Sequence, residues 1–380
     1  MYFCMAADNR PQLRRGFLKA VGASSVGITL AGCTDDDSGE QDNDTDDGAD
    51  DGSTDDGSWP PPRNLVEFIT PTNPGSTRDL VGRYWADFMQ EHYPDGVSTS
   101  VSATPGAQGI LAANAGANAD PDGGTVLCLD FVPMLMNEIQ REEADYTTTD
   151  FASWAIVRQV TRGVQVNHRT TDVEDHWEMT YDELIDAVIE DEWVGGSATG
   201  TQYLFYEVLE RVEPRLEEGD LNIVTFDGGG ELRAAVERGD IDWYCGGFTS
   251  NYNREQFYKT QFAVSDDRYP EMNEKIYGND ENAVLLGELG MDEEGAETLI
   301  DMMVDAIGFH LPPGTPNNIV ETHIETFDTT AEEEPELEET INNALGPGEF
   351  VAISGEEVEE QVAAKAQVMY DNQDLLPTEF

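Results

Sequence analysis

Short β-branched and apolar runs alternate with glycine-containing turns and longer amphipathic segments from Pro60 onward. In the first half, the apolar runs 65–70, 97–101 and 125–129 predict strands, and helical patterns follow the first two runs, to about residue 92 and over 110–119. The second half repeats the order with strands at 192–194, 221–226 and 240–245 and helices over 202–212 and 231–238. Strands that alternate with helices predict an α/β fold with mostly parallel sheets.

Four glycine-containing turns join a predicted strand to a predicted helix, at 71–77, 104–109, 195–201 and 228–230. At such a turn, backbone N–H groups and the positive end of the helix can hold an anion without a basic side chain. A single glycine turn usually reflects backbone geometry alone. Two turns in each half of the chain favour a cleft for a carboxylate or phosphate. None of the turns matches a P-loop or a dinucleotide-binding GxGxxG motif.

The candidate ligand contacts are the backbone N–H groups and hydroxyls of these turns. They are Asn73, Gly75, Ser76, Thr77, Gly106, Gln108, Gly109, Ser197, Thr199, Gly200, Thr201, Gly228 and Gly229. Arg78 follows the first turn directly, where its guanidinium either adds a positive charge to the site or points to solvent.

The acidic composition of the chain excludes some classes of function. The 380 residues contain 78 Asp and Glu against 20 Lys and Arg, for a net charge of −58. Such a chain lacks the basic footprint that nucleic acid or an anionic lipid surface requires. Self-repulsion of this size would weaken a compact state, but in molar salt the screening length is only about 3 Å. We therefore expect a protein of a salt-saturated environment, with an ordinary acidic mesophilic protein as the alternative.

The N-terminus is typical of an export signal. Arg14-Arg15 followed by Phe17-Leu18-Lys19 resembles the twin-arginine motif, and the apolar run 20–31 is too short to span a membrane. The run ends in Leu-Ala-Gly-Cys33, which resembles a lipobox and predicts Cys33 as a lipid anchor, the alternative being a chance match inside an ordinary signal. Residues 1–33 are thus assigned to a twin-arginine lipoprotein signal, which would leave the protein at the outer face of the cell membrane.

Residues 34–61 are expected to form a disordered tether. The segment 34–58 carries eleven Asp and one Glu with no basic residue, so it cannot bury apolar surface and repels itself. It lacks the ligand spacing of a calcium loop, which favours a solvated spacer over a calcium site. Residues 59–380 still hold 65 acidic and 16 basic residues, so the folded part is acidic in its own right.

Signals for catalysis are scarce. The sequence contains no GxSxG elbow, no HExxH and no histidine spacing suited to a metal, and no cofactor is expected. Cys128 and Cys245 stand in apolar, strand-like contexts and are predicted to be buried free thiols. Four aromatic residues could line a pocket, although core packing is the default reading: Tyr203, Tyr206, Trp243 and Tyr244.

Several of these segments together resemble one family, the extracytoplasmic solute receptors of tripartite tricarboxylate transporters, also called Bug or TctC-like periplasmic binding proteins, here as a haloarchaeal-type lipoprotein. Phe68-Ile-Thr-Pro71 with Asn73-Pro-Gly-Ser-Thr-Arg-Asp79 resembles the first strand and loop of the family. The blocks 104–110, 119–127, 197–201, 228–242 and 309–316 resemble later family segments in the same order. Departures include Ser76 and Gln108 where the family has glycine, and a longer acidic segment at 266–306.

The resemblance implies a two-lobed α/β periplasmic-binding-protein fold (Venus flytrap, type II-like) with a hinge and an interlobe ligand cleft. Lobe one would comprise 62–162 plus 305–380 and lobe two 163–304. It implies a monomeric receptor, not an enzyme, that captures a small organic carboxylate and delivers it to the permease subunits of the membrane transporter. The alternatives are a receptor of a TRAP or ABC transporter, a stand-alone sensor, and, least favoured, an exported hydrolase.

Overall fold

The computed structural model describes residues 59–376 except 176, 190–192, 198–200, 218, 227–228, 248–257, 266–273, 275–284, 289 and 292. The export signal, the anchor Cys33 and nearly all of the acidic tether lie outside the described residues, as do Thr199, Gly200 and Gly228. Within the described part, no helix is long and apolar enough to cross a membrane.

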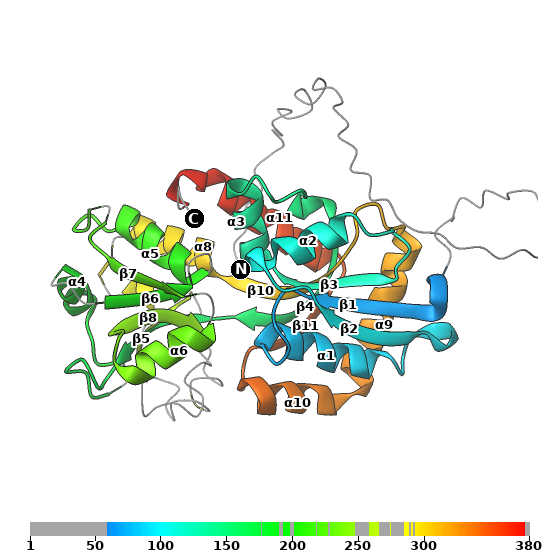
Figure 1. Cartoon of the computed structure of the whole chain (residues 1–380), viewed down its shortest axis with the longest axis horizontal. Helices are drawn as coiled ribbons and strands as arrows, with labels where there is room; N and C mark the ends of the chain where they lie inside the picture. Colours follow the sequence, from blue (N-terminus) through cyan, green and yellow to red (C-terminus); the bar gives the residue numbers. More distant parts are fainter. Residues whose placement is uncertain are drawn as a thin grey trace, which may run out of the picture. The chain divides into compact units, whose positions relative to one another are not determined.

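The first lobe is built on a six-stranded mixed sheet in the order β11-β4-β10-β3-β1-β2 (Figure 1). Its strands are β1 Leu65–Thr70, β2 Ser98–Ala103, β3 Thr125–Asp130, β4 Ala152–Val160, β10 Asp305–Leu311 and β11 Phe350–Ser354. The three N-terminal strands β1, β2 and β3 run parallel, whereas β10 is antiparallel to both β3 and β4, and β11 is antiparallel to β4.

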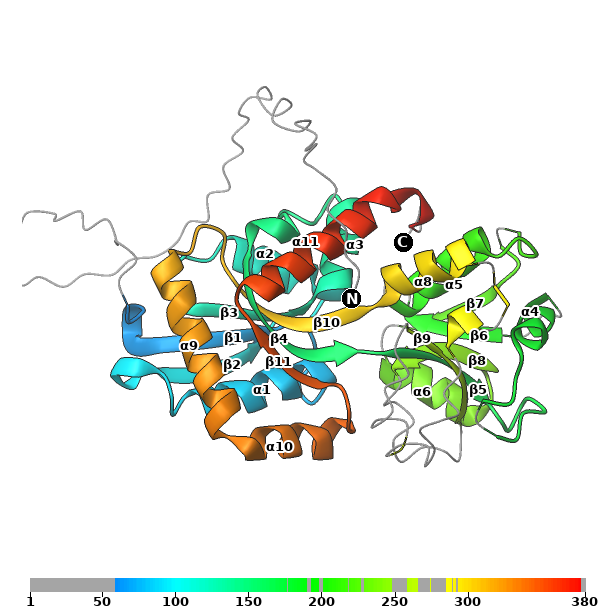
Figure 2. The same cartoon turned by 180° about the vertical axis from the view of Figure 1, so that it is seen from behind.

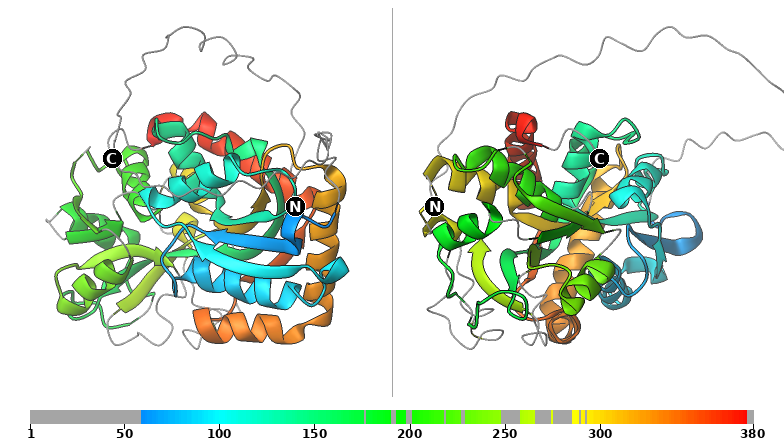
Figure 3. Two further views of the ribbon diagram at one scale, coloured as in Figure 1. Left: turned by 45° about the vertical axis from the view of Figure 1, so that its right-hand side comes forward. Right: turned by 60° about the vertical axis from the view of Figure 1, so that its left-hand side comes forward.

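Helices cover both faces of this sheet. They are α1 Thr77–Met89, α2 Ile110–Ala117, α3 Phe131–Gln140, α9 Asn317–Glu333, α10 Pro335–Leu345 and α11 Glu356–Asp371. Helices α1, α9 and α10 share one core cluster, in which the buried Trp85 ring stacks on Phe327 with centroids 4.3 Å apart. Helix α11 lies on the opposite face from α10, as the views in Figure 2 and Figure 3 agree.

The second lobe is built on a five-stranded sheet in the order β7-β6-β8-β5-β9. Its strands are β5 Arg162–Asn167, β6 Trp193–Ser197, β7 Asn222–Phe226, β8 Trp243–Gly247 and β9 Tyr258–Val264, and its helices are α4 Tyr181–Ile189, α5 Thr201–Val212, α6 Gly229–Arg238 and α8 Glu293–Met303. Strand β6 is parallel to β7 and β8, and β5 is antiparallel to β8 and β9.

Short 3₁₀ helices occur in the connections. They are η1 Pro62–Asn64, η2 Pro94–Gly96, η3 Ala107–Gly109, η4 Thr148–Asp150, η6 Leu286–Glu288 and η7 Gln373–Leu375.

The chain passes between the two sheets twice (Figure 2). It leaves the first sheet in β4, turns at Thr161 and enters β5 of the second sheet, and it returns from α8 into β10 at Asp305. Both passages use strands that run antiparallel to their neighbours. The sheets are therefore mixed, which corrects the expectation of mostly parallel sheets and confirms the α/β class.

Candidate functional site

The predicted ligand turns follow the carboxyl ends of strands in both sheets. In the first sheet, β1 ends at Thr70, β2 at Ala103 and β3 at Asp130. In the second sheet, β6 ends at Ser197, and α5 begins at Thr201. Ligands of α/β proteins bind outside the carboxyl ends of strands, where helix N-termini also point.

The first turn is held together by its own side chains. Ser76 caps α1, and its Oγ accepts the Asp79 N–H at 3.4 Å and forms a short hydrogen bond with the Thr72 hydroxyl. The Gly75 N–H donates to the Asp79 carboxylate at 2.7 Å, and the Ser76 N–H donates to the carbonyl of Asn73 at 3.2 Å. Two N–H groups of the predicted donor turn Asn73–Thr77 thus already have acceptors within the protein.

Two donors remain at the start of α1. The N–H groups of Thr77 and Arg78 have no acceptor within the described part of the chain. They lie in the first helical turn, where the partial positive charge of the helix is concentrated. The first turn can therefore offer an anion two backbone donors from α1.

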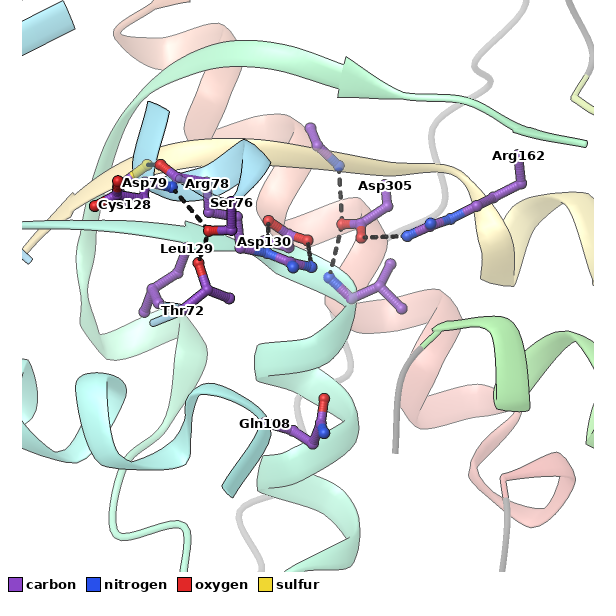
Figure 4. Close-up of polar contacts among 12 residues, drawn as sticks. Thr72, Ser76, Arg78, Asp79, Gln108, Cys128, Leu129, Asp130, Arg162 and Asp305 are labelled. Atoms are coloured by element: carbon purple, nitrogen blue, oxygen red, sulfur yellow. Dashed lines mark hydrogen bonds and ion pairs between the residues drawn. The ribbon is translucent and has the colours of Figure 1, made fainter. Parts of the chain in front are cut away.

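The side chain of Arg78 is paired with a carboxylate at the end of β3. Its Nε donates to Oδ1 of Asp130 at 2.8 Å, and NH2 contacts Oδ2 of the same carboxylate (Figure 4). The side chain of Asp130 is 2% exposed and that of Arg78 is 32% exposed. The positive charge beside the first turn is therefore neutralised by the end of β3.

The second turn has an unusual backbone. Its four residues all have positive φ: 134° at Gly106, 45° at Ala107, 54° at Gln108 and 95° at Gly109. A left-handed conformation costs a residue with a Cβ roughly 1–2 kcal/mol, and such strain persists only where the surroundings enforce it. Asn137 helps to hold the turn in this conformation, because its side-chain amide donates to the carbonyl of Gln108 at 3.1 Å.

The strained turn leaves donors unused. The Gly109 N–H returns to the carbonyl of Gly106 at 3.1 Å, but in the described part of the chain the N–H groups of Ala107 and Gln108 have no acceptor. Strained backbone conformations cluster at ligand-binding positions, where they aim specific groups. Together with Thr77 and Arg78, this turn offers four backbone donors that have no acceptor among the described residues.

The second lobe is described less completely. Thr201 opens α5 and is 3% exposed, and Gly229 opens α6. Ser197 is the last residue of β6. The remaining predicted contacts of this lobe lie outside the described residues.

The aromatic residues considered for a pocket belong to the core. Tyr206, Trp243 and Tyr244 are at most 3% exposed. The rings of Tyr206 and Trp243 pack edge to face at 5.6 Å, and the Tyr206 hydroxyl accepts the backbone N–H of Cys245 at 2.8 Å. The core reading is confirmed for these three.

A cluster of charged side chains that the sequence analysis did not predict lies where the chain passes between the sheets. Asp305 at the start of β10 accepts the N–H groups of Val132 and Ala306 on Oδ1, at 3.0 and 2.8 Å. Its Oδ2 lies 3.9 Å from NH2 of Arg162, the first residue of β5 (Figure 4). Burial, followed by the nearby charge of Asp130, raises the pKa of Asp305 to about 6. The cluster contains two carboxylates and two guanidinium groups, from Arg78, Asp130, Arg162 and Asp305.

Among the described residues, no group of three or more His, Cys, Asp or Glu side chains could hold a metal ion. Cys128 and Cys245 are buried free thiols, as predicted. Burial raises the pKa of Cys128, and it raises the pKa of Cys245 to about 12. Neither thiol would ionise as a nucleophile at neutral pH.

No protein-family model and no curated protein matches the sequence. Solved structures do match. MatC from Rhodopseudomonas palustris, solved with bound malate, is 19% identical over 83% of this chain and 100% of its own, with a TM-score of 0.62. The periplasmic binding protein BugD is 17% identical over 82% and 97%, with a TM-score of 0.63. Rpa4515 from R. palustris, solved with adipate, is 18% identical over 84% and 98%, with a TM-score of 0.65.

Likeness at this level of identity establishes the fold. The chain has the two-lobed α/β fold of periplasmic solute-binding proteins, as the two sheets and the two passages between them indicate. The predicted fold class is confirmed.

Proposed function

We propose that the protein is an extracytoplasmic receptor that binds a small organic carboxylate, in the manner of the solute receptors of tripartite tricarboxylate transporters. The observation that carries this proposal is the set of unpaired backbone donors at Thr77, Arg78, Ala107 and Gln108, at the carboxyl ends of β1 and β2. It is supported by the fold shared with MatC and Rpa4515, which were solved with malate and adipate.

Backbone donors suit an acidic protein that must bind an anion. Each charge-assisted hydrogen bond contributes about 1.5–3 kcal/mol, so a few can dominate the affinity. In molar salt the screening length of about 3 Å removes most of the distant repulsion but leaves such short contacts intact. The binding site therefore needs no excess of basic side chains.

Binding would be coupled to a conformational change of the two lobes, proposed as 62–162 plus 305–380 and 163–304. A ligand that contacts the turns of the first lobe and Thr201 of the second binds the closed arrangement more tightly than the open one, and so favours it. In this proposal the permease subunits of the transporter recognise the closed form.

The test is thermal unfolding in molar salt with a panel of small carboxylates, sugars and peptides. A carboxylate present at 100 times its dissociation constant stabilises the folded protein by about 2.7 kcal/mol. Thr201→Leu should abolish this shift, because it places a bulky apolar side chain at the start of α5. Thr322→Leu is the control at a site away from the candidate turns: Thr322 is half-buried on α9, and its hydroxyl donates to the carbonyl of Asn318. Stabilisation by sugars or peptides alone would overturn the carboxylate assignment.

Export and anchoring form a separate part of the proposal, because they rest on sequence motifs outside the described residues. Cys33→Ser should release the protein from the membrane fraction into the medium. Replacing Arg14 and Arg15 together by Lys should trap the precursor inside the cell. Retention of the first variant at the membrane would contradict the anchor, and normal export of the second would contradict the twin-arginine route.

The competing functions predict different observations. A gene pair next to this one, encoding a large permease and a small membrane subunit, would favour the tripartite transporter over a TRAP or ABC system or a stand-alone sensor. An exported hydrolase would turn over an ester or amide substrate, and the deeply buried thiols Cys128 and Cys245 speak against a cysteine nucleophile.

A further inference from the structure

Arg162 is a buried cation that leaves most of its hydrogen-bonding capacity unused within the described part of the chain. Its side chain is 8% exposed, and NH2 lies 3.9 Å from Oδ2 of Asp305, too far for a hydrogen bond. Within the described part of the chain, neither Nε of Arg162 nor Oδ2 of Asp305 has a hydrogen-bond partner. A buried guanidinium normally satisfies several of its five N–H donors, so Arg162 retains donors that a further acceptor could use.

Arg162 lies at the end of the second sheet from which the candidate ligand turns emerge. It opens β5 and pairs with Gly247, the last residue of β8. Strand β6 is parallel to β8, with Val194 opposite Trp243, so Ser197, the last residue of β6, lies at the same end of the sheet. Arg162 is also the first residue of the second sheet after the chain leaves the first one.

Asp305 occupies the matching position on the first sheet. In β10, Ile307 lies opposite Asp130, the last residue of β3, so Asp305 extends past the carboxyl end of β3. Figure 4 shows Arg78, Asp130, Asp305 and Arg162 following one another in this order. The cluster thus runs from the first ligand turn to the passage between the sheets, with the cation Arg162 at its far end.

We propose that Arg162 binds the distal carboxylate of a dicarboxylate ligand, exchanging its long ion pair with Asp305 for hydrogen bonds to the ligand. This inference rests on the proposed function, in which the turns of the first lobe bind the other carboxylate. A guanidinium presents paired donors that match a carboxylate, which Asp305 cannot satisfy because its Oδ1 is held by Val132 and Ala306. The ligand class of the site is therefore a compound with two anionic ends.

The exchange would also place the ligand in contact with the passage between the two sheets. Arg162 follows Thr161, the residue at which the chain passes from β4 to β5. A ligand that joins the turns of the first lobe to Arg162 connects the two sides of this passage. A monocarboxylate can occupy only one side and leaves the ion pair with Asp305 in place.

The test is calorimetric titration of the folded protein in molar salt at pH 7.5. The probes are straight-chain dicarboxylates of four to eight carbons and the monocarboxylates of equal length. Wild type should bind at least one dicarboxylate at least tenfold more tightly than its monocarboxylate counterpart. Arg162→Gln should weaken that dicarboxylate at least tenfold and the monocarboxylate less than threefold. Arg238→Gln removes the same charge from the same lobe at an exposed ion pair with Asp240, and should change neither.

Two further variants protect the test against misfolding. Arg162→Gln takes from the buried carboxylate of Asp305 the guanidinium that is paired with it. The double variant Arg162→Gln with Asp305→Asn restores the charge balance and should bind dicarboxylates as weakly as Arg162→Gln. Asp305→Asn alone removes the competing anion and should bind them more tightly than wild type. Equal losses for mono- and dicarboxylates, or no loss in the double variant, would overturn the role of Arg162. Failure of wild type to bind any carboxylate would instead overturn the proposed function.

Discussion

The Nε of Arg78 donates a 2.8 Å hydrogen bond to Oδ1 of Asp130, which ties the first turn of α1 to the carboxyl end of β3. The carboxylate is 2% exposed, whereas a third of the guanidinium side chain reaches solvent. Loss of its partner should therefore cost Asp130 more than it costs Arg78. The carboxylate is too deeply buried for solvent to replace the cation, whereas the guanidinium can turn outward.

This asymmetry predicts different stability losses for the two single variants. Arg78→Gln leaves a buried carboxylate beside Asp305 and should lower the free energy of unfolding by about 2–3 kcal/mol, slightly less than a fully buried pair would cost. Asp130→Asn should cost about 1 kcal/mol, because it also removes a like charge from Asp305. Urea unfolding in molar salt measures both. A larger loss for Asp130→Asn than for Arg78→Gln would contradict the explanation.

The strained turn makes a second prediction. Gly106 has φ 134° and ψ 155°, a region that only glycine enters readily, and a Cβ there would lie 2.7 Å from Cδ1 of Leu111. Gly106→Ala should therefore destabilise the protein by about 1–3 kcal/mol and abolish the thermal shift with carboxylates. Gly314→Ala is the control, because φ is 87° there and a Cβ would contact nothing within 4 Å. It should cost about 1 kcal/mol and leave carboxylate binding intact.

Local elements were predictable because their signals are local. The apolar run 65–70 coincides with β1, and the glycine turn before α5 places that helix within one residue of its expected start. The strand expected at 240–245 begins only at Trp243, because the preceding acidic residues belong to the turn after α6. The antiparallel strands β4, β10 and β11 were not predicted, since strand order depends on pairings between residues far apart in the sequence.

The site was predictable only in part, for a related reason. Glycine spacing indicated the turn Gly106–Gly109, but it did not indicate that the Gly75 N–H donates a hydrogen bond to Asp79. Arg162 and Asp305 stand at the expected crossings between lobes, yet among 78 acidic residues one aspartate carries no signal. Their pairing becomes visible only when β5 and β10 are placed in their sheets.

Two buried histidines make a third prediction, about stability and pH. In His323, Nε2–H donates to the carbonyl of Gly123 at 3.1 Å and Nδ1 accepts the Tyr93 hydroxyl at 2.8 Å, which fixes the neutral tautomer. Burial lowers the pKa of His323, and likewise of His310, to about 4. The unfolded chain binds the proton near pH 6.5, so the stability from each histidine is complete above pH 6.5 and is lost as pH falls toward 4.

The pH prediction is best measured as a difference between proteins, because protonation of many surface carboxylates relieves repulsion over the same range. His323→Gln keeps a donor and an acceptor but cannot titrate there. Between pH 7.5 and pH 5, wild type should lose about 2 kcal/mol of unfolding free energy relative to this variant. A difference that stays constant with pH would show that His323 has the same pKa in the folded and the unfolded chain, and would contradict the prediction.

The last prediction concerns ligand binding and the proton on Asp305. Four charged groups influence this carboxylate: Asp130 at the end of β3, Arg162 on β5, Arg78 on α1 and Lys365 on α11. Burial and the charge of Asp130 raise the pKa of Asp305 to about 6, because their effect outweighs that of the two guanidinium groups. A ligand carboxylate that takes Arg162 from Asp305 removes a stabilising cation and adds a like charge. Both changes raise the pKa of Asp305 further in the complex.

Dicarboxylate binding should therefore take up as much as one proton, and the association constant should rise by up to tenfold per pH unit as pH falls from 7.5 toward 6. Below about pH 5 the ligand itself gains protons and the trend reverses. Titration at pH 7 in two buffers of different ionisation enthalpy measures the uptake directly. Asp305→Asn has no carboxyl group to protonate, so its binding should show no uptake and little dependence on pH over this range. Equal proton uptake by wild type and Asp305→Asn would assign the proton to another group and contradict the exchange at Arg162.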